Sequence, residues 1–198
     1  MGITQQIGAS SIIKPGVCTS STRPASPYEG QMIYETDTDL VRVWNGTAWR
    51  TTDSATSTSG SVLQIVQGTT STPVTSSSAT YVSTGLTATI TPKSTTNKIL
   101  VVVHQAGGDK SNANSANAIN LRLMRGAAQM TLMAHSAGYT ATALNVRIAT
   151  ISTMYLDSPA TTSATTYSTE FFSNSGAASA TLQVGGDLST ITLMEISA

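Results

Sequence analysis

The chain has 198 residues and is polar without being highly charged, because 27 Ser and 34 Thr stand beside only 10 acidic and 10 basic residues, with zero formal net charge. Zero net charge and scattered Lys and Arg give no long-range field for phosphates or anionic lipids, so we expect no nucleic-acid and no membrane partner. No uncharged apolar run approaches the ~18 residues of a membrane span. A hydrophobic fraction of 39% is enough to build a core.

Residues 1–29 predict an extended N-terminal arm with three prolines, Pro15, Pro24 and Pro27. Proline fixes its own φ and biases the preceding residue toward extended geometry, so this segment cannot bury apolar side chains through its own secondary structure. The apolar side chains of the arm must then be covered by the chain's own domain, by a sister subunit or by another protein. The alternative is that the arm is a free, solvated tail. Four isoleucines are candidate docking residues: Ile3, Ile7, Ile12 and Ile13.

Residues 30–52 predict a small β module of three strands, at 31–35, 40–44 and 47–50. Asn45-Gly46 predicts a hairpin with a type I′ turn, in which both residues adopt a positive φ. Roughly twenty residues cannot form an independent core, and large aromatic side chains commonly anchor interfaces. The alternative, compatible with docking, is that the two tryptophans pack across their own hairpin. The candidate docking residues here are Met32, Tyr34, Trp44 and Trp49.

Residues 53–61 are rich in Ser and Thr and predict a linker, whereas residues 62–198 carry evenly spaced strand candidates without convincing helical periodicity. Their number and spacing predict an all-β fold, an antiparallel β-sandwich of the jelly-roll type. The expected strands are 62–67, 80–83, 86–91, 98–104, 118–125, 129–134, 146–156, 164–172, 180–184 and 189–196.

Two of these strands carry apolar side chains on both faces, namely 99–103, which is apolar throughout, and 189–196. Only one face of each sheet in a sandwich meets the core, so the outer face of these strands needs a cover. We expect a closed homotrimer to provide it, the alternative being a monomer whose loops fold over the outer face. The candidate subunit-interface residues are Leu100, Val102, Met194 and Ile196.

The sequence lacks the patterns typical of an enzyme. His104 and His135 have no metal-ligand spacing, and no Gly-x-Ser-x-Gly motif or phosphate-binding loop is present. Asp37 and Asp39 lack the further oxygen donors of a calcium loop and are interpreted as turn residues. Cys18 is the single cysteine and cannot form an internal disulfide. We therefore expect no catalytic residue, no metal site and no cofactor.

Two parts of the chain resemble structural proteins of tailed bacteriophages. Residues 23–38 together with 43–49 resemble a segment that recurs in such proteins, with the pattern P-x-x-G-x-x-[IV]-Y-x-T-D-T…W-N-G-x-x-W. Residues 80–94 followed by 98–101, and the ending 191–196, are similar to the globular part of phage fibre and capsid-decoration proteins.

The resemblance implies a homotrimeric β-sandwich head in a capsid decoration (cement) or head-fibre protein, whose arm and module clasp the major capsid protein or another virion protein. It implies a place on the virion surface after assembly in the host cytoplasm. The competing hypothesis is a tail-fibre or tail-tip module that recognises a host surface glycan or protein. For that alternative, an exposed loop expected at 109–117 supplies four candidate binding residues: Lys110, Asn112, Asn114 and Asn117.

Overall fold

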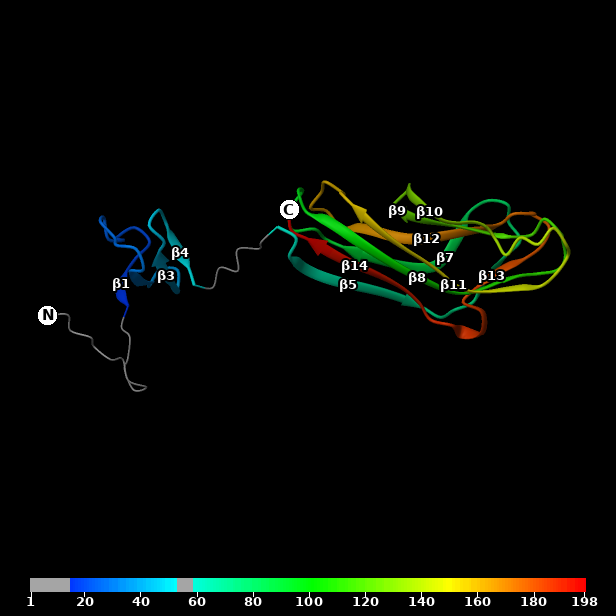
Figure 1. The fold of residues 1–198 in the computed structure, drawn as a ribbon, viewed down its shortest axis with the longest axis horizontal. Coiled ribbons are helices and arrows are strands. Elements are labelled where there is room, and N and C mark those ends of the chain that lie inside the picture. The colour runs from blue at the N-terminus through cyan, green and yellow to red at the C-terminus, as the bar shows by residue number, and fades with distance from the viewer. Residues whose placement is uncertain (1–14, 53–58) are drawn as a thin grey trace. The chain divides into compact units, whose positions relative to one another are not determined.

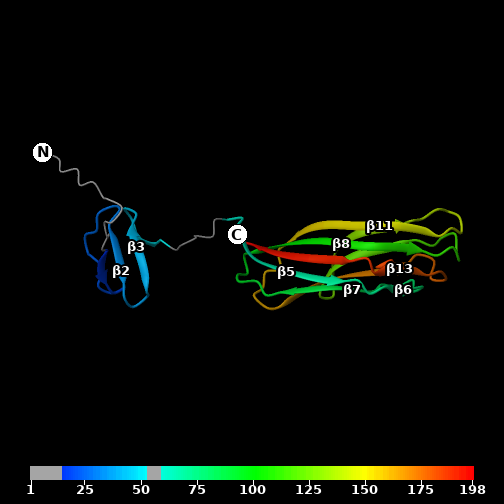
Figure 2. The ribbon, with the colours of Figure 1, turned by 90° about the horizontal axis from the view of Figure 1, so that it is seen from below.

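The computed structural model describes residues 15–52 and 59–198, which belong to two compact units, residues 1–58 and 59–198. We call the described part of the first unit the N-terminal module and the second unit the head. Both are built from β-strands (Figures 1 and 2). Within the described ranges, no helix has the length and apolar character needed to span a bilayer.

The head consists of two antiparallel sheets that face each other. One sheet has the order β5-β14-β8, with β11 on the other side of β8 (Val62–Thr70, Ser189–Ile196, Lys98–Lys110 and Val146–Asp157). The facing sheet has the order β7-β12-β9-β10 (Val82–Ile90, Thr165–Ser173, Ile119–Arg125 and Ala128–Ala137). Two short strands, β6 (Val74–Ser76) and β13 (Ala180–Leu182), extend the first sheet at the C-terminal end of β8, and a 3-10 turn, η1 (Val184–Gly186), follows β13.

The strand order confirms the predicted fold class. Each sheet interleaves early and late strands, and the chain passes repeatedly from one sheet to the other, as in the two nested Greek keys of a jelly roll. Inward-facing positions repeat every second residue, as in β7, where Leu86, Ala88 and Ile90 are buried between exposed threonines. These side chains pack against Ile99, Val101 and Val103 of β8 in the main core cluster.

Two places where the sequence analysis expects a strand to end lie inside longer strands. The predicted break between residues 83 and 86 is a bulge in β7, where Gly85 has a φ of 81° and the register with β12 shifts. Strand β8 continues past its predicted end at residue 104 to Lys110, and Gly107, with a φ of 61°, lies where its partner changes from β14 to β13. Glycine inside a strand often marks such an irregularity.

The N-terminal module is a four-stranded sheet of order β1-β2-β3-β4 (Gly16–Cys18, Met32–Glu35, Leu40–Trp44 and Trp49–Thr51). This corrects the expected boundary at residue 29 and the expected count of three strands. Strand β1 lies in the predicted arm, but it pairs in parallel with β2, so the described part of that arm belongs to the module. A strand of three residues with one exposed valine has too weak a pattern to be recognised from sequence.

The predicted hairpin is present, with a different turn. Trp44 and Trp49 are cross-strand partners, but the loop between them has four residues and only Gly46 has a positive φ. The side-chain Oδ1 of Asn45 accepts hydrogen bonds from the backbone N of Thr47 (3.1 Å) and Ala48 (2.8 Å). The asparagine therefore organises the turn through its side chain, which replaces the type I′ backbone.

Strands β5 and β7, which belong to different sheets of the head, lie in close contact at Gly68. A Cβ added to Gly68 would stand 1.9 Å from the carbonyl oxygen of Thr87. We expect Gly68→Ala to destabilise the head by about 1–3 kcal/mol, because backbone atoms cannot yield as a flexible side chain does. Urea unfolding followed by circular dichroism measures this. The control is Gly16→Ala in β1, where the nearest atoms would lie at 3.8 and 4.0 Å, and an unchanged head transition in Gly68→Ala would contradict the prediction.

Candidate functional site

The most unusual surface of the head is the outer face of the sheet formed by β5, β14, β8 and β11. Residues that pair across neighbouring strands lie on the same face of a sheet. Leu156, Leu100, Met194 and Ile65 are paired in turn and form one apolar row across all four strands. We define the apolar face by this row and its neighbours: Val62, Ile65, Leu100, Val102, Met154, Leu156, Met194 and Ile196.

The apolar face is open to solvent in a single copy. Met154 is 72% exposed and Ile65 61% exposed, which are unusual fractions for large apolar side chains inside long strands. The predicted interface residues Leu100, Val102, Met194 and Ile196 all lie on this face and are half-buried. The four most exposed members were not predicted. They could have been found from the pairing of strands, because β11 lies beside β8 and β5 lies beside β14, the two strands whose outer faces the sequence analysis identified.

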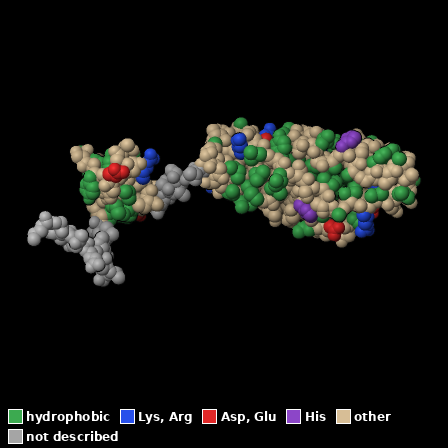
Figure 3. All heavy atoms as spheres, in the orientation of Figure 1, with side chains coloured by type: hydrophobic (Ala, Val, Ile, Leu, Met, Phe, Trp, Pro, Cys, Tyr) green, Lys and Arg blue, Asp and Glu red, His purple; other side chains and the backbone are tan. Residues whose placement is uncertain are grey.

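Polarity changes along this face. The row that contains Met154 and Val102 continues through Thr192 and Gln67, and the next row contains Ser152, His104 and Thr190. The apolar part therefore occupies the end of the head where Gly60 donates a backbone hydrogen bond to Ser197 and the chain enters. Figure 3 shows hydrophobic side chains gathered over β5, β14 and β8 at this end.

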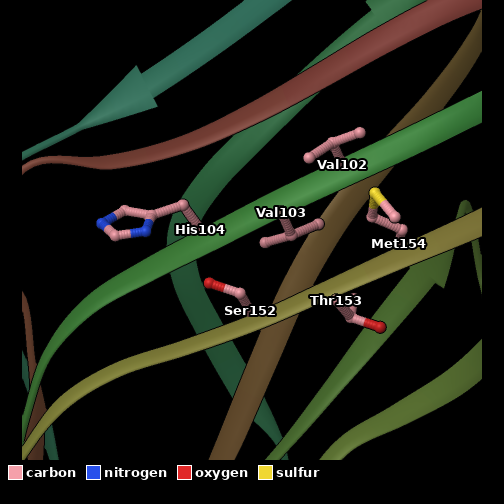
Figure 4. A pocket seen from close by; sticks show the side chains of 6 residues that line it. All are labelled: Val102, Val103, His104, Ser152, Thr153 and Met154. Carbon is pink, nitrogen blue, oxygen red and sulfur yellow. The ribbon is translucent and has the colours of Figure 1, made fainter.

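A shallow hollow lies on the same face between β8 and β11. It has a volume of about 560 Å³ and is lined by Val102, Val103, His104, Ser152, Thr153 and Met154 (Figure 4). Val102 and Met154 give it an apolar wall, and His104 and Ser152 lie at its polar end. The structure gives no hydrogen bond between His104 and Ser152 among the residues it describes.

The outer face of the opposite sheet has a different character. It carries exposed threonines on β7 and β12, and an ion pair between Arg122 and Glu170 (2.6 Å) near its centre. The Arg122 guanidinium also lies 3.7 Å above the ring of Tyr81. Leu132 is 48% exposed on this face, but its cross-strand neighbour is Arg122. The two outer faces of the head thus differ, and only one of them presents a continuous apolar surface.

The N-terminal module is organised around one buried carboxylate. Glu35 is fully buried and accepts hydrogen bonds from Arg23 Nε, from Arg42 Nε (2.7 Å) and from Thr38 Oγ1 (2.9 Å). The hydrogen bond from Arg23, together with those from Arg42 and Thr38 and against the opposing effect of burial, lowers the pKa of Glu35 to about 2. Ile33 is the large apolar side chain that this sheet buries beside Glu35. The ionic network is therefore the main connection between the strands and the loop that joins β1 to β2, which carries Arg23.

A second carboxylate ties the same loop to the sheet. Asp37 accepts hydrogen bonds from the backbone N (2.8 Å) and Oγ (2.5 Å) of Ser20, and the bond from the Ser20 hydroxyl lowers the pKa of Asp37. Tyr34 donates its hydroxyl hydrogen to Asp39. The acidic residues of the Y-x-T-D-T segment therefore serve structure, which agrees with their interpretation as turn residues.

The four docking residues predicted in the module lie on two different faces. Met32 and Tyr34 share the open face with Val17, which is 71% exposed. Trp44 and Trp49 lie on the other face with their ring centroids 5.6 Å apart, in an edge-on arrangement. The tryptophans pack across their own hairpin, as the alternative interpretation had it. The remaining predicted docking residues, Ile3, Ile7, Ile12 and Ile13, lie outside the described residues.

The expected binding loop at 109–117 is only partly exposed, and two of its predicted residues are corrected. Lys110 is fully buried at the end of β8 and donates to Thr140 Oγ1 (2.7 Å). Asn117 is also fully buried, with its amide bonded to the backbone oxygens of Ser111 and Ser179. Asn112 is exposed and Asn114 is half-buried. A polar run predicts exposure on average, but it does not reveal which members pack against neighbouring loops.

Metal-binding groups of three or more His, Cys, Asp or Glu are absent from residues 15–52 and 59–198. His104 lies on the outer face of β8, and His135 lies in β10 of the other sheet. The two histidines therefore do not form a common site.

Comparisons with known proteins give structural neighbours only. No protein-family model matches the chain, and no curated protein matches it. It is similar to a crystal structure of the infectious bursal disease virus VP2 subviral particle, with 14% identity and a TM-score of 0.36 over 89% of this chain and 46% of that chain. A structure of the infectious bursal disease virus Gt strain gives 12% identity and a TM-score of 0.36, over 78% and 42% of the two chains. The chain thus spans less than half the length of these neighbours.

The Glu35 network makes the stability of the module depend on pH. The folded pKa of about 2 lies below the ordinary value of 4.5, so the folded module binds fewer protons than the unfolded chain. This stabilisation is complete above pH 4.5 and is lost as the pH falls toward 2. Both tryptophans lie in the module, so tryptophan fluorescence during urea unfolding reports on it alone.

We expect Glu35→Gln to lower the unfolding midpoint of the module at pH 7 and to flatten its dependence on pH between 4.5 and 2. Asp37 keeps part of that dependence, since its pKa is also lowered. The exposed carboxylate of Glu29 offers a matched control, Glu29→Gln. Identical pH profiles for Glu35→Gln and the unaltered protein would show that the network does not stabilise the module.

Proposed function

We propose that this protein is a structural, non-enzymatic component of a tailed-bacteriophage particle: a homotrimeric capsid decoration (cement) or head-fibre protein on the virion surface, assembled in the host cytoplasm. The N-terminal module binds the major capsid protein or another virion protein, and the head is displayed outward. The similarity of residues 23–38 and 43–49 to phage structural proteins supports the viral assignment. In the structure these residues lie together in one compact unit.

The apolar face of the head carries the proposal. Four of the eight apolar side chains on this sheet face are more than half exposed and the other four are half-buried, whereas the opposite outer face carries an ion pair near its centre. Large contiguous apolar surfaces on a soluble domain mark association sites. In a closed ring of three copies, the apolar face of each head is covered by the neighbouring copies, and no copy is left with this face exposed.

Attachment to the particle is assigned to the open face of the module. Met32 and Tyr34 lie there beside Val17, and the cross-strand partners of these two residues are Val43 and Val41. The sheet is held by its ionic network on the other face, so the open face is free to bind a partner without loss of the fold. The tryptophans, which pack on each other, contribute to the module's own stability.

A tail-fibre or tail-tip receptor-binding role is the second candidate, favoured by the uncharged loops that connect β8 to β9, β10 to β11 and β12 to β13. Copy number separates the two roles. Quantitative mass spectrometry of purified particles that gives hundreds of copies supports a capsid location, whereas six or fewer trimers support a tail location. Absence from intact particles would overturn both.

The self-association is tested at residues that are already exposed in a single copy. Ile65→Lys and Met154→Lys each place a charge on the apolar face, and exposed substitutions change folding stability by only about 0.5 kcal/mol or less. We expect the unaltered protein to have three times the 20.4 kDa chain mass in light scattering after size-exclusion chromatography, and the variants to shift toward one chain mass.

The matched control is Thr89→Lys, an exposed position on the outer face of the opposite sheet. It should leave the trimer intact. A single-chain mass for the unaltered protein at all concentrations would contradict the proposal, as would equal masses for the unaltered protein and the two apolar-face variants.

A further inference from the structure

Three loops gather at the end of the head that lies opposite to the point where the chain enters. They connect β8 to β9 (residues 111–118), β10 to β11 (138–145) and β12 to β13 (174–179). Figures 1 and 2 show them together at the far end, whereas the C-terminus and the start of β5 lie at the near end. We call these three loops the distal tip.

Hydrogen bonds between the loops hold the distal tip in one conformation. Lys110 and Asn117, which the sequence analysis proposed as ligand contacts, instead connect the loops. Lys110 Nζ donates to Thr140 Oγ1 (2.7 Å), and Asn117 Nδ2 donates to the backbone oxygen of Ser179 (2.9 Å). The backbone N of Asn112 donates to Asn145 Oδ1 (2.8 Å). Binding to a surface that is already ordered avoids much of the entropy cost of fixing loops.

The loop between β10 and β11 also holds a strained residue. Ala141 has a φ of 55°, in the left-handed region that is unfavourable for a residue with a Cβ. The two flanking threonines hold it there, because Thr140 Oγ1 donates to the oxygen of Thr142 (2.8 Å) and Thr142 Oγ1 donates to the oxygen of Thr140 (3.3 Å). Strain that the surrounding structure maintains is typical of functional loops.

The three loops themselves present an uncharged, amphipathic surface, and the ammonium group of Lys110 is buried beneath it. Tyr139 is 55% exposed and Leu144 54% exposed on the same loop, and Asn112 is exposed on the neighbouring one. The three loops contain no Asp, Glu, Lys, Arg or His. Tyrosine with serine and asparagine is the composition of recognition loops in general, in which the ring supplies rigid contact area and the small polar groups supply hydrogen bonds.

We propose that the distal tip is a binding site for a neutral glycan. The exposed Tyr139 ring packs against the apolar face of a sugar ring, and amide and hydroxyl groups such as that of Asn112 bind its hydroxyls. The absence of charge from the loops selects against sialylated, sulfated and phosphorylated ligands, because it provides no ion pair to offset their desolvation. This site goes beyond the architectural role proposed above, which does not require it.

The test uses the full chain and an array of immobilised neutral oligosaccharides, with sialylated and sulfated oligosaccharides on the same surface. We expect binding to members of the neutral set, at least a tenfold loss of affinity in Tyr139→Ala, and near-unaltered affinity in Tyr139→Phe, which keeps the ring. The control variant is Tyr28→Ala, because Tyr28 is a 71% exposed tyrosine in the N-terminal module. Thermal unfolding of each variant establishes that the head is folded.

Three results would overturn the proposal: no retention of any neutral oligosaccharide at millimolar concentration, a preference for the acidic set, or equal affinities for Tyr139→Ala and the unaltered protein. The same variants keep the trimer mass if the proposed architecture is right, because Tyr139 lies outside the apolar face. Failure of glycan binding and failure of trimer formation are therefore separate outcomes.

Discussion

A sandwich of two sheets buries only the two faces that meet, and this constraint governs how the molecule can be used. In the head, the inner faces are filled by side chains such as Leu86, Val101 and Leu193, which are almost fully buried. The outer faces must then be compatible with water or with a partner. One is compatible with water, through threonines and the Arg122–Glu170 ion pair, while the other carries the apolar face. The two outer faces of the head therefore differ in polarity.

The N-terminal module is stabilised differently from the head, because a four-stranded sheet of short strands cannot enclose a large hydrophobic core. Glu35 replaces much of that core, because Arg23 from the preceding loop and Arg42 from β3 both bind its carboxylate. Asp37 holds the same loop through Ser20. The motif that resembles phage structural proteins therefore encodes the fold of the module more than its contact surface. The docking surface that we propose, the open face with Met32 and Tyr34, lies on the other side of the sheet from this network.

Sequence patterns gave most strands because inward and outward residues alternate in them, as in β7, and because Asn45-Gly46 marks a hairpin. They located Leu100, Val102, Met194 and Ile196 on an outer face, since runs of apolar residues cannot all face one core. They could not give Met154 or Ile65, whose place on that face follows from pairing across strands distant in sequence. They also failed for Lys110 and Asn117, whose burial depends on loops that meet only in the folded head.

The central claim is that other copies of the chain cover the apolar face, and the oxidation of methionine tests it most directly. Met154 is 72% exposed in a single copy, whereas Met32 of the module is 38% exposed. Oxidation by dilute peroxide follows the accessibility of the sulfur and can be followed for each residue by peptide mass spectrometry. In the purified protein, the account predicts that Met154 is oxidised more slowly than Met32. Faster oxidation of Met154 at every protein concentration would contradict it, because the face would then be open to solvent.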